Sequence, residues 1–170
     1  MPEEQRGIIL HVDRHELGLL NLEIVRFKMH TGHKAEKGQV FIPLTNEQAD
    51  SLEGFNRTHK TEPGYASLTL LHGEKRINWN KFYPFGTKKQ GPTGMGIGSR
   101  IHHAIVEYLA KNYQLDKYTV LHVLVSNSAR KQLSRIGIEQ TAPHLFPAYR
   151  QLVKTAVTNR FGTEPKVEMP

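Results

Sequence analysis

The order of elements expected between residues 76 and 125 constrains the fold of this chain more than any other feature. Arg76–Tyr83 and Tyr118–Val125 have the length and composition of strands, and an amphipathic helix is predicted to begin between them, near Gly98. The helix is indicated by apolar residues three and four positions apart, namely Ile97, Ile101, Ala104, Ile105, Tyr108 and Leu109. This order predicts parallel neighbouring strands joined by a right-handed crossover, and hence an α/β layer that binds ligands at its strand ends.

The first part of the chain is expected to be mostly sheet. Gly7–Val12 and Leu20–Met29 are apolar runs on either side of "DRHELG", which predicts a hairpin. In the second run, leucine and isoleucine alternate with polar residues up to residue 24. Glu23 is therefore expected on the polar face, before the pattern changes face near Val25.

A short strand, a helix and a second hairpin are expected next. Val40–Leu44 is apolar, and its Pro43 predicts an edge strand or the end of a strand. The sequence "TNEQ" has the capping signature of a helix start, which predicts a helix from about Asn46 to Phe55. The hairpin is expected over residues 66–83, around "HGEK".

The last part of the chain is expected to be helical. Ser126–Arg135 has apolar residues along one side of a helix that Gly137 would end, and Pro147 can start another helix that reaches about Phe161. The whole pattern predicts an α/β fold with an α+β mixed sheet, a β-rich N-terminal third and an additional C-terminal helix. The expected single domain is divided into a mostly β part (1–83), a cofactor-loop core (84–138), and a C-terminal helix and tail (139–170).

The composition excludes several classes of chemistry. The chain has no cysteine, which removes disulfides, thiolate catalysis and sulfur-ligated zinc. No apolar run approaches the roughly 18 residues of a membrane-spanning helix, and Met1–Arg6 is charged, so a cytoplasmic protein without a membrane partner is expected. The formal net charge of +7 favours an anionic partner: nucleic acid, a phosphorylated cofactor or an acidic protein surface.

Ten histidines raise the question of a metal site. His11 with His15, and His30 with His33, have spacings that suit ligand pairs on helices. Both pairs are expected at strand ends or turns, where this spacing has no such meaning. The adjacent histidines at 102–103 point about 100° apart on a helix. No metal site is therefore expected.

Glycines gather directly before the expected helix, in "QGPTGMGIGS". Residues without a side chain let backbone amides approach a ligand, and the start of a helix turns its positive end toward an anion. Lys88 and Lys89 add positive charge nearby. The stretch lacks the Gly-Lys-Ser/Thr ending of a Walker motif. Two interpretations stay open, a phosphate-binding loop and a surface loop before an ordinary core helix.

The pattern "TGMGIGSRIHHAIVEYLAKN" followed by "VLHVLVSNSARKQLSRIGI" resembles the GNAT superfamily of N-acetyltransferases, over about residues 83–138. In that family a loop reading Arg-Gly-x-Gly-Ile-Gly opens a long helix, and the next strand leads to an Asn and an Ala before a helix that ends in Gly-Phe. The resemblance implies that the loop backbone binds the pyrophosphate of acetyl-CoA or another acyl-CoA. It assigns cofactor binding to Thr93, Gly94, Met95, Gly96, Ile97, Gly98 and Ser99, and to Asn127 if the alignment slips by one residue.

Acyl transfer to an amine needs a base for the amine and a donor that polarises the thioester carbonyl. By the resemblance, the polarising backbone amide lies on the strand that includes Asn80–Tyr83, splayed from its parallel neighbour near residues 122–125. We name Tyr83 and His122 as candidate catalytic residues. Further candidate bases are Glu23, His72 and Glu74. Each of them can instead be an ordinary structural or solvent-exposed residue.

Three functions stay open at this point. The first is an acyl-CoA-dependent N-acyltransferase that acts on an amine of a small molecule, a protein or an RNA-linked group. The second is a nucleic-acid-binding protein that uses its basic second half, with Phe82, Tyr83 and Phe85 beside the glycine stretch. The third is a non-catalytic interaction domain, because Leu133 stands where many GNAT members carry a tyrosine general acid. An oligomer is compatible with each of them.

Overall fold

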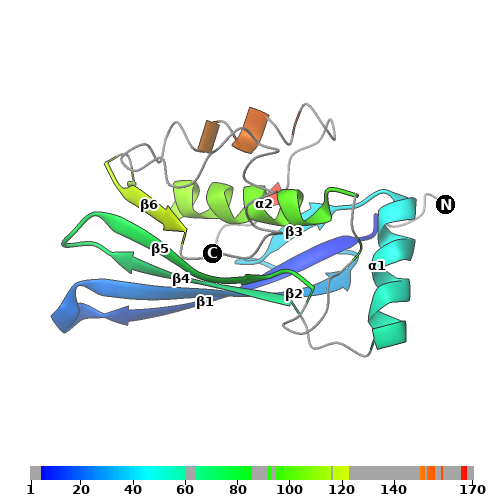
Figure 1. Ribbon diagram of the computed structural model, residues 1–170, viewed down its shortest axis with the longest axis horizontal. Helices are drawn as coiled ribbons and strands as arrows, with labels where there is room; N and C mark the ends of the chain where they lie inside the picture. Colours follow the sequence, from blue (N-terminus) through cyan, green and yellow to red (C-terminus); the bar gives the residue numbers. More distant parts are fainter. Residues whose placement is uncertain are drawn as a thin grey trace.

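The protein is described by a computed structural model, which places residues 5–59, 64–85, 92, 95–115, 117–122, 150–151, 153–155, 158 and 166–167. These residues form one mixed sheet, with a long helix along one face and a second helix at one end (Figure 1). The expected mixed α/β class is confirmed. The elements are β1 (Gly7–Leu17), η1 (Gly18–Leu20), β2 (Leu22–Gly32), β3 (Val40–Pro43), α1 (Asn46–His59), β4 (Gly64–Leu71), β5 (Arg76–Tyr83), α2 (Ile97–Asn112), β6 (Thr119–His122) and β7 (Lys166–Val167).

The strands that are described lie in the order β6-β5-β4-β2-β1-β3-β7. All neighbouring pairs are antiparallel except β5 and β6, which are parallel and are connected through α2. The parallel pair predicted from the strand, helix and strand order is therefore confirmed. Both expected hairpins are present, and β3 ends at Pro43 as expected, because proline has no N–H to continue the ladder.

The first hairpin differs from its prediction in two ways. Its strands run through the stretch assigned to the loop and pair from Gly7↔Gly32 to Leu17↔Leu22. The turn is short because Asn21 adopts a left-handed conformation with φ 50°, which asparagine tolerates better than most residues. The predicted polar face was also wrong, since Glu23 lies on the buried face of β2 with Val25.

The helix α2 lies along one face of the sheet (Figure 1). Its expected apolar stripe is confirmed, and every member is at most 1% exposed. The helix is more buried than an amphipathic pattern predicts, because the described residues 150–151, 153–155 and 158 lie over it on the side away from the sheet (Figure 1). On this second side His103 and Glu107 are also buried, and Arg150 donates a hydrogen bond of 3.1 Å to Glu107.

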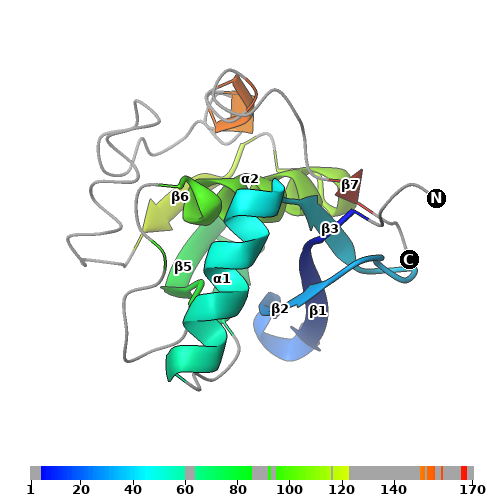
Figure 2. The same ribbon diagram turned by 90° about the vertical axis from the view of Figure 1, so that its right-hand side faces the viewer.

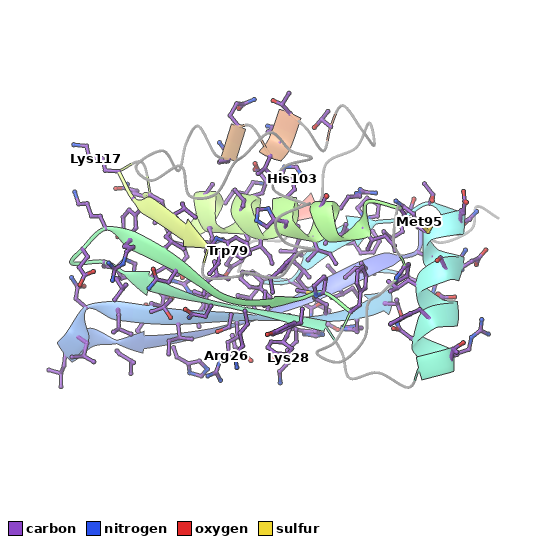
Figure 3. All side chains as sticks on the ribbon, in the orientation of Figure 1. Arg26, Lys28, Trp79, Met95, His103 and Lys117 are labelled. Carbon is purple, nitrogen blue, oxygen red and sulfur yellow. The ribbon has the colours of Figure 1, made fainter. Side chains whose placement is uncertain are left out.

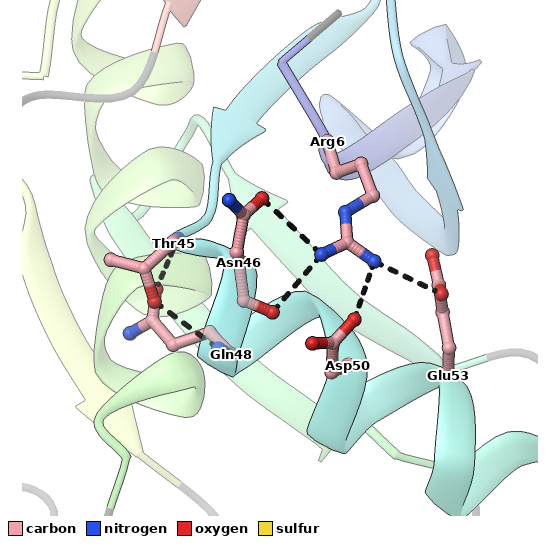
Figure 4. A network of polar contacts seen from close by, with 6 residues as sticks. All are labelled: Arg6, Thr45, Asn46, Gln48, Asp50 and Glu53. Carbon is pink, nitrogen blue, oxygen red and sulfur yellow. Dashed lines mark hydrogen bonds and ion pairs between the residues drawn. The ribbon is translucent and has the colours of Figure 1, made fainter. Parts of the chain in front are cut away.

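The helix α1 begins with the expected capping box. The Thr45 N–H donates to Gln48 Oε1 at 3.0 Å, and the Gln48 N–H donates to Thr45 Oγ1 at 3.1 Å. Figure 4 shows Arg6 beside this turn, with its guanidinium donating to Asp50 and to the Asn46 carbonyl. These bonds join the start of β1 to α1. The helix continues past the predicted end at residue 55, to residue 59.

The end of the sheet is covered by α1. In Figure 2 this helix runs across the sheet end, with its beginning beside α2. In the part of the chain that the structure describes, no helix is long and apolar enough to cross a membrane.

Several predicted elements lie outside the described residues: the end of the strand after residue 122, the helix 126–135, and the start of the last helix at Pro147. The described residues between 150 and 158 are helical, and Val153 of the predicted stripe is fully buried.

Candidate functional site

The beginning of α2 lies where the glycine pattern predicts it. Helix α2 starts at Ile97, and Gly96 before it has φ 73° and ψ 14°. This left-handed conformation favours glycine, because a Cβ atom makes it unfavourable for most other residues. The Arg100 N–H donates to the Gly96 carbonyl at 3.2 Å and closes the first turn. Of the predicted cofactor-binding residues, Met95 to Ser99 are described, whereas Thr93, Gly94 and Asn127 lie outside the described residues.

A side chain from α1 holds the residue before this turn. The Gln48 side chain is 5% exposed, and its Nε2 donates to the Met95 carbonyl at 3.0 Å. Figure 3 shows Met95 beside α1. Gln48 thus has two functions, because its oxygen caps α1 while its nitrogen fixes the approach to α2. Sequence reasoning identified only the first.

A buried cation lies in the first turn of α2. Arg100 is 2% exposed, and burial lowers the pKa of its guanidinium. Its charge lies near the positive end of the helix dipole, and no acidic residue occupies this turn. The amide groups of the first turn, which lack acceptors within the helix, can donate hydrogen bonds to an anion at this helix start.

The described register of β5 with β6 runs from Arg76↔Thr119 to Trp79↔His122, and β5 itself continues to Tyr83. The pairing of β5 with β4 changes after Trp79, because Trp79 pairs with Leu68 and Lys81 pairs with Ser67. Asn80 is the extra residue of this β-bulge. Bulges disrupt the ladder locally and leave backbone groups of the extra residue unpaired with the neighbouring strand.

Aromatic rings fix β5 against α2 beside the bulge. The indole of Trp79 stacks on the imidazole of His102, with ring centroids 4.6 Å apart and planes 19° apart. Phe82 lies edge-on to both rings, at 6.0 Å from Trp79 and 5.8 Å from His102. Trp79 is fully buried, so this end of the strand pair has a defined position relative to the start of α2.

The two predicted catalytic residues have different surroundings. Tyr83 lies on the sheet face opposite α2, with its ring centroid 5.4 Å from that of Tyr65. His122 ends β6, and its Cα pairs with that of Trp79. The His122 side chain lies outside what the structure describes. The structure therefore brings the His122 backbone to the bulge, while Tyr83 lies four residues beyond Trp79 along β5.

A second polar cluster lies near the other end of α2. We define the Glu23 cluster as Glu23, Arg14, His72, Tyr113 and Tyr118. Glu23 Oε1 accepts hydrogen bonds from Arg14 Nε at 2.7 Å and from the Tyr113 hydroxyl at 2.6 Å. His72 Nε2 lies 3.5 Å from Glu23 Oε2, and its Nδ1 is hydrogen-bonded to the Tyr118 hydroxyl at 2.7 Å. Sequence reasoning considered Glu23 and His72 separately, and it missed the other three residues.

The electrostatics of the Glu23 cluster argue against Glu23 as a general base. Burial acts to raise the pKa of Glu23, but the hydrogen bonds from Arg14 and Tyr113 outweigh it, and the pKa lies below its ordinary value. The pKa of Tyr113 is raised by burial and by its bond to the carboxylate. An ionised carboxylate with several donors is a weak proton acceptor, so the cluster joins β1, β2 and the end of α2 as a structural network.

No group of three or more metal-ligating side chains gathers in the described ranges. His11 and His30 are stacked with ring centroids 4.6 Å apart, and His11 Nδ1 is hydrogen-bonded to Gln39.

Comparisons with family models, with curated proteins and with solved structures found no match for the chain. The function therefore has to be argued from the site itself.

Proposed function

We propose that this protein is an acyl-CoA-dependent N-acyltransferase with a GNAT-like fold. The observation that carries the proposal is the parallel pair β5 and β6, which α2 connects, with the bulge at Asn80 next to the Trp79↔His122 pair. In α/β sheets, ligands bind beyond the carboxyl ends of parallel strands, next to the starts of the helices that follow them. The two ends of this site suit the two parts of an acyl-CoA.

The pyrophosphate would bind at the beginning of α2. The left-handed Gly96 turns the backbone into the helix without a side chain in the way, and the following amides have no acceptor within the helix. Arg100 supplies a buried positive charge in the same turn. Gln48 keeps the preceding carbonyl, that of Met95, turned toward α1 and so away from an anion. Acetyl-CoA or another acyl-CoA is the proposed cosubstrate.

The acyl group would lie against the bulge of β5. A backbone N–H left out of the ladder near Asn80 can donate to the thioester carbonyl and stabilise the negative charge that develops on its oxygen. The amine nitrogen then attacks the carbonyl carbon, the new C–N bond forms, and the C–S bond breaks. A base takes the proton of the amine, and the departing thiolate is protonated. His122, whose backbone pairs beside the bulge, stays a candidate residue for these proton transfers, whereas the ring of Tyr83, the other candidate, lies on the sheet face opposite α2.

The acceptor is an amine on a small molecule, on a protein or on an RNA-linked group. Thiol release from acetyl-CoA, followed with panels of polyamines, peptides and aminoacyl compounds, tests the proposed reaction. We expect release that depends on both the amine and the protein, and inhibition by desulfo-CoA, which keeps the pyrophosphate but lacks the sulfur. Acetyl-CoA binding without transfer to any amine would contradict the catalytic part of the proposal and favour a non-catalytic acyl-CoA-binding domain.

A further inference from the structure

The sheet face opposite α2 carries no helix among the described residues (Figure 1). We call it the open face. The alternation of strand residues and the cross-strand registers define its members. Ile9 of β1 and Phe41 of β3, which pair with each other, are buried, at 6% and 7% exposed. The exposed or half-buried members include His11, Asp13 and His15 of β1; Ile24, Arg26, Lys28 and His30 of β2; Tyr65, Ser67, Thr69 and Leu71 of β4; and Arg76, Asn78, Lys81 and Tyr83 of β5.

The open face is positively charged. Its cations are Arg26, Lys28, Arg76 and Lys81, and its one acidic member is Asp13. Arg26 and Lys28 are exposed, and Figure 3 shows both on the side of the sheet away from α2. The charge is arranged in rows, because residues that pair across strands share a face. The row across β1, β2, β4 and β5 reads Asp13, Arg26, Ser67 and Lys81.

The adjacent row combines three rings with one cation. It reads His11, Lys28, Tyr65 and Tyr83, with the centroids of the two tyrosine rings 5.4 Å apart and their planes tilted by 53°. Both tyrosines are half-buried, so their rings are held by the sheet while part of each stays accessible. Lys28 pairs directly with Tyr65. Accessible rings beside cations can stack on bases while the cations neutralise phosphates.

The apolar surface of the molecule argues against a lipid or a hydrophobic protein partner on this face. Among the described residues, the exposed large apolar side chains are Leu17, Leu19 and Leu20. All three lie at the tip of the β1–β2 hairpin, away from the two rows. Accessible tyrosine rings can stack on unpaired bases, which a duplex does not present.

We propose that the open face binds single-stranded nucleic acid across these two rows. Tyr65 and Tyr83 stack on bases, and Arg26, Lys28 and Lys81 contact phosphates. This surface differs from the basic second half considered from the sequence, although Tyr83 belongs to both. The proposal does not depend on acyl transfer, since it concerns the face opposite α2.

Fluorescence anisotropy with labelled oligo(U) and oligo(dT) of about 12 nucleotides tests whether the cations of the open face contact phosphates. The informative variant is Arg26→Gln/Lys28→Gln. Lys117→Gln is its control, because Lys117 is also exposed but lies on the other side of the sheet in Figure 3. We expect wild type to bind with strong salt dependence, and the double variant to lower the slope of log affinity against log salt by about 1.4, or 0.7 per phosphate contact. The control should change the affinity little.

The stacking part is tested by Tyr65→Phe and Tyr65→Ala. The phenylalanine keeps a ring and should keep the affinity, whereas alanine should lower it roughly tenfold. A melting temperature close to that of wild type shows that each variant is folded. Equal losses for Lys117→Gln and the double variant, no loss for Tyr65→Ala, or retention on anionic vesicles without oligonucleotide binding would overturn the proposal. Stronger binding of oligo(U) than of oligo(dT) would identify RNA as the ligand, and the reverse would identify DNA, both within the proposal.

Discussion

The indole of Trp79 stacks on the imidazole of His102 with ring centroids 4.6 Å apart, and Trp79 is also the β5 residue of the last described pair with β6, Trp79↔His122. One ring pair thus fixes three features of the proposed site relative to one another: the bulge, the last described paired residue of β6 and the second turn of α2. Because both rings are at most 3% exposed, the contact is part of the core as well as of the site.

Replacing Trp79 with leucine should separate β5 from α2. We expect Trp79→Leu to lower the free energy of unfolding by about 3 kcal/mol, because a large buried ring is lost and a cavity remains. Acetyl-CoA affinity should fall as well. Trp79→Phe keeps a ring against His102 and should lose less of both. Urea unfolding and calorimetry measure the two effects, and equal losses for Leu and Phe would contradict a role for the ring stack.

Gln48 offers a way to separate the capping of α1 from the positioning of α2. Gln48→Glu keeps the oxygen that accepts from Thr45 but loses the donor to the Met95 carbonyl. We expect faster hydrogen exchange at the amides of residues 95–99 and weaker acetyl-CoA binding, with α1 intact. In Gln48→Ala both contacts are lost, and α1 should also lose about 1 kcal/mol of stability. Unchanged exchange in Gln48→Glu would show that the Met95 contact does not order the turn.

The Glu23 cluster predicts a pH dependence of stability. The folded-state pKa of Glu23 is lowered, so its contribution is fully present above the unfolded pKa of about 4.3 and is lost as the pH falls through the folded pKa. Glu23→Gln should therefore be less stable than wild type by roughly 2 kcal/mol at pH 7, and the difference should shrink below about pH 4. Denaturant unfolding over pH 3–7 measures it. A difference that is independent of pH would contradict the assignment.

Tyr113→Phe removes one donor from the same carboxylate. The Tyr113 hydroxyl donates a hydrogen bond to Glu23 Oε1 at 2.6 Å, so the variant should raise the pKa of Glu23 and shift acid unfolding to higher pH. We expect the free energy of unfolding at neutral pH to fall by about 1.5 kcal/mol. Tyr118→Phe is the matched control, because that hydroxyl bonds His72 instead of the carboxylate. An equal shift of acid unfolding in both variants would argue against a direct effect on Glu23.

Local patterns predicted the elements well where one period dominates. The helix α2 and the capping box of α1 follow from spacing alone, and the parallel pair follows from the order of elements. Glu23 was assigned to the wrong face because the residues that donate hydrogen bonds to its buried carboxylate are distant in the sequence. Tyr113 is 90 positions away in the chain, and no local pattern reports its hydroxyl. The second buried side of α2 was missed for the same reason, since residues near 150 cover it.

The bulge at Asn80 explains the part of the site that periodicity misses. Simple alternation from Ile77 and Trp79 would place Tyr83 on the α2 side of the sheet. The extra residue reverses the alternation, so Phe82 packs toward the core and Tyr83 pairs with Tyr65 on the open face. One inserted residue therefore decides which side chains face α2 and which face a partner of the sheet.

The most direct test of the central claim is calorimetric titration of acetyl-CoA into wild type, Gly96→Asn and Gly96→Asp. Asparagine and aspartate have the same shape and both tolerate a positive φ, so the variants differ only in the charge at the start of α2. We predict saturable binding by wild type and an affinity for Gly96→Asp at least tenfold below that of Gly96→Asn, or about 1.4 kcal/mol. Equal affinities of the two variants, or no binding by wild type, would contradict a pyrophosphate site at this helix start.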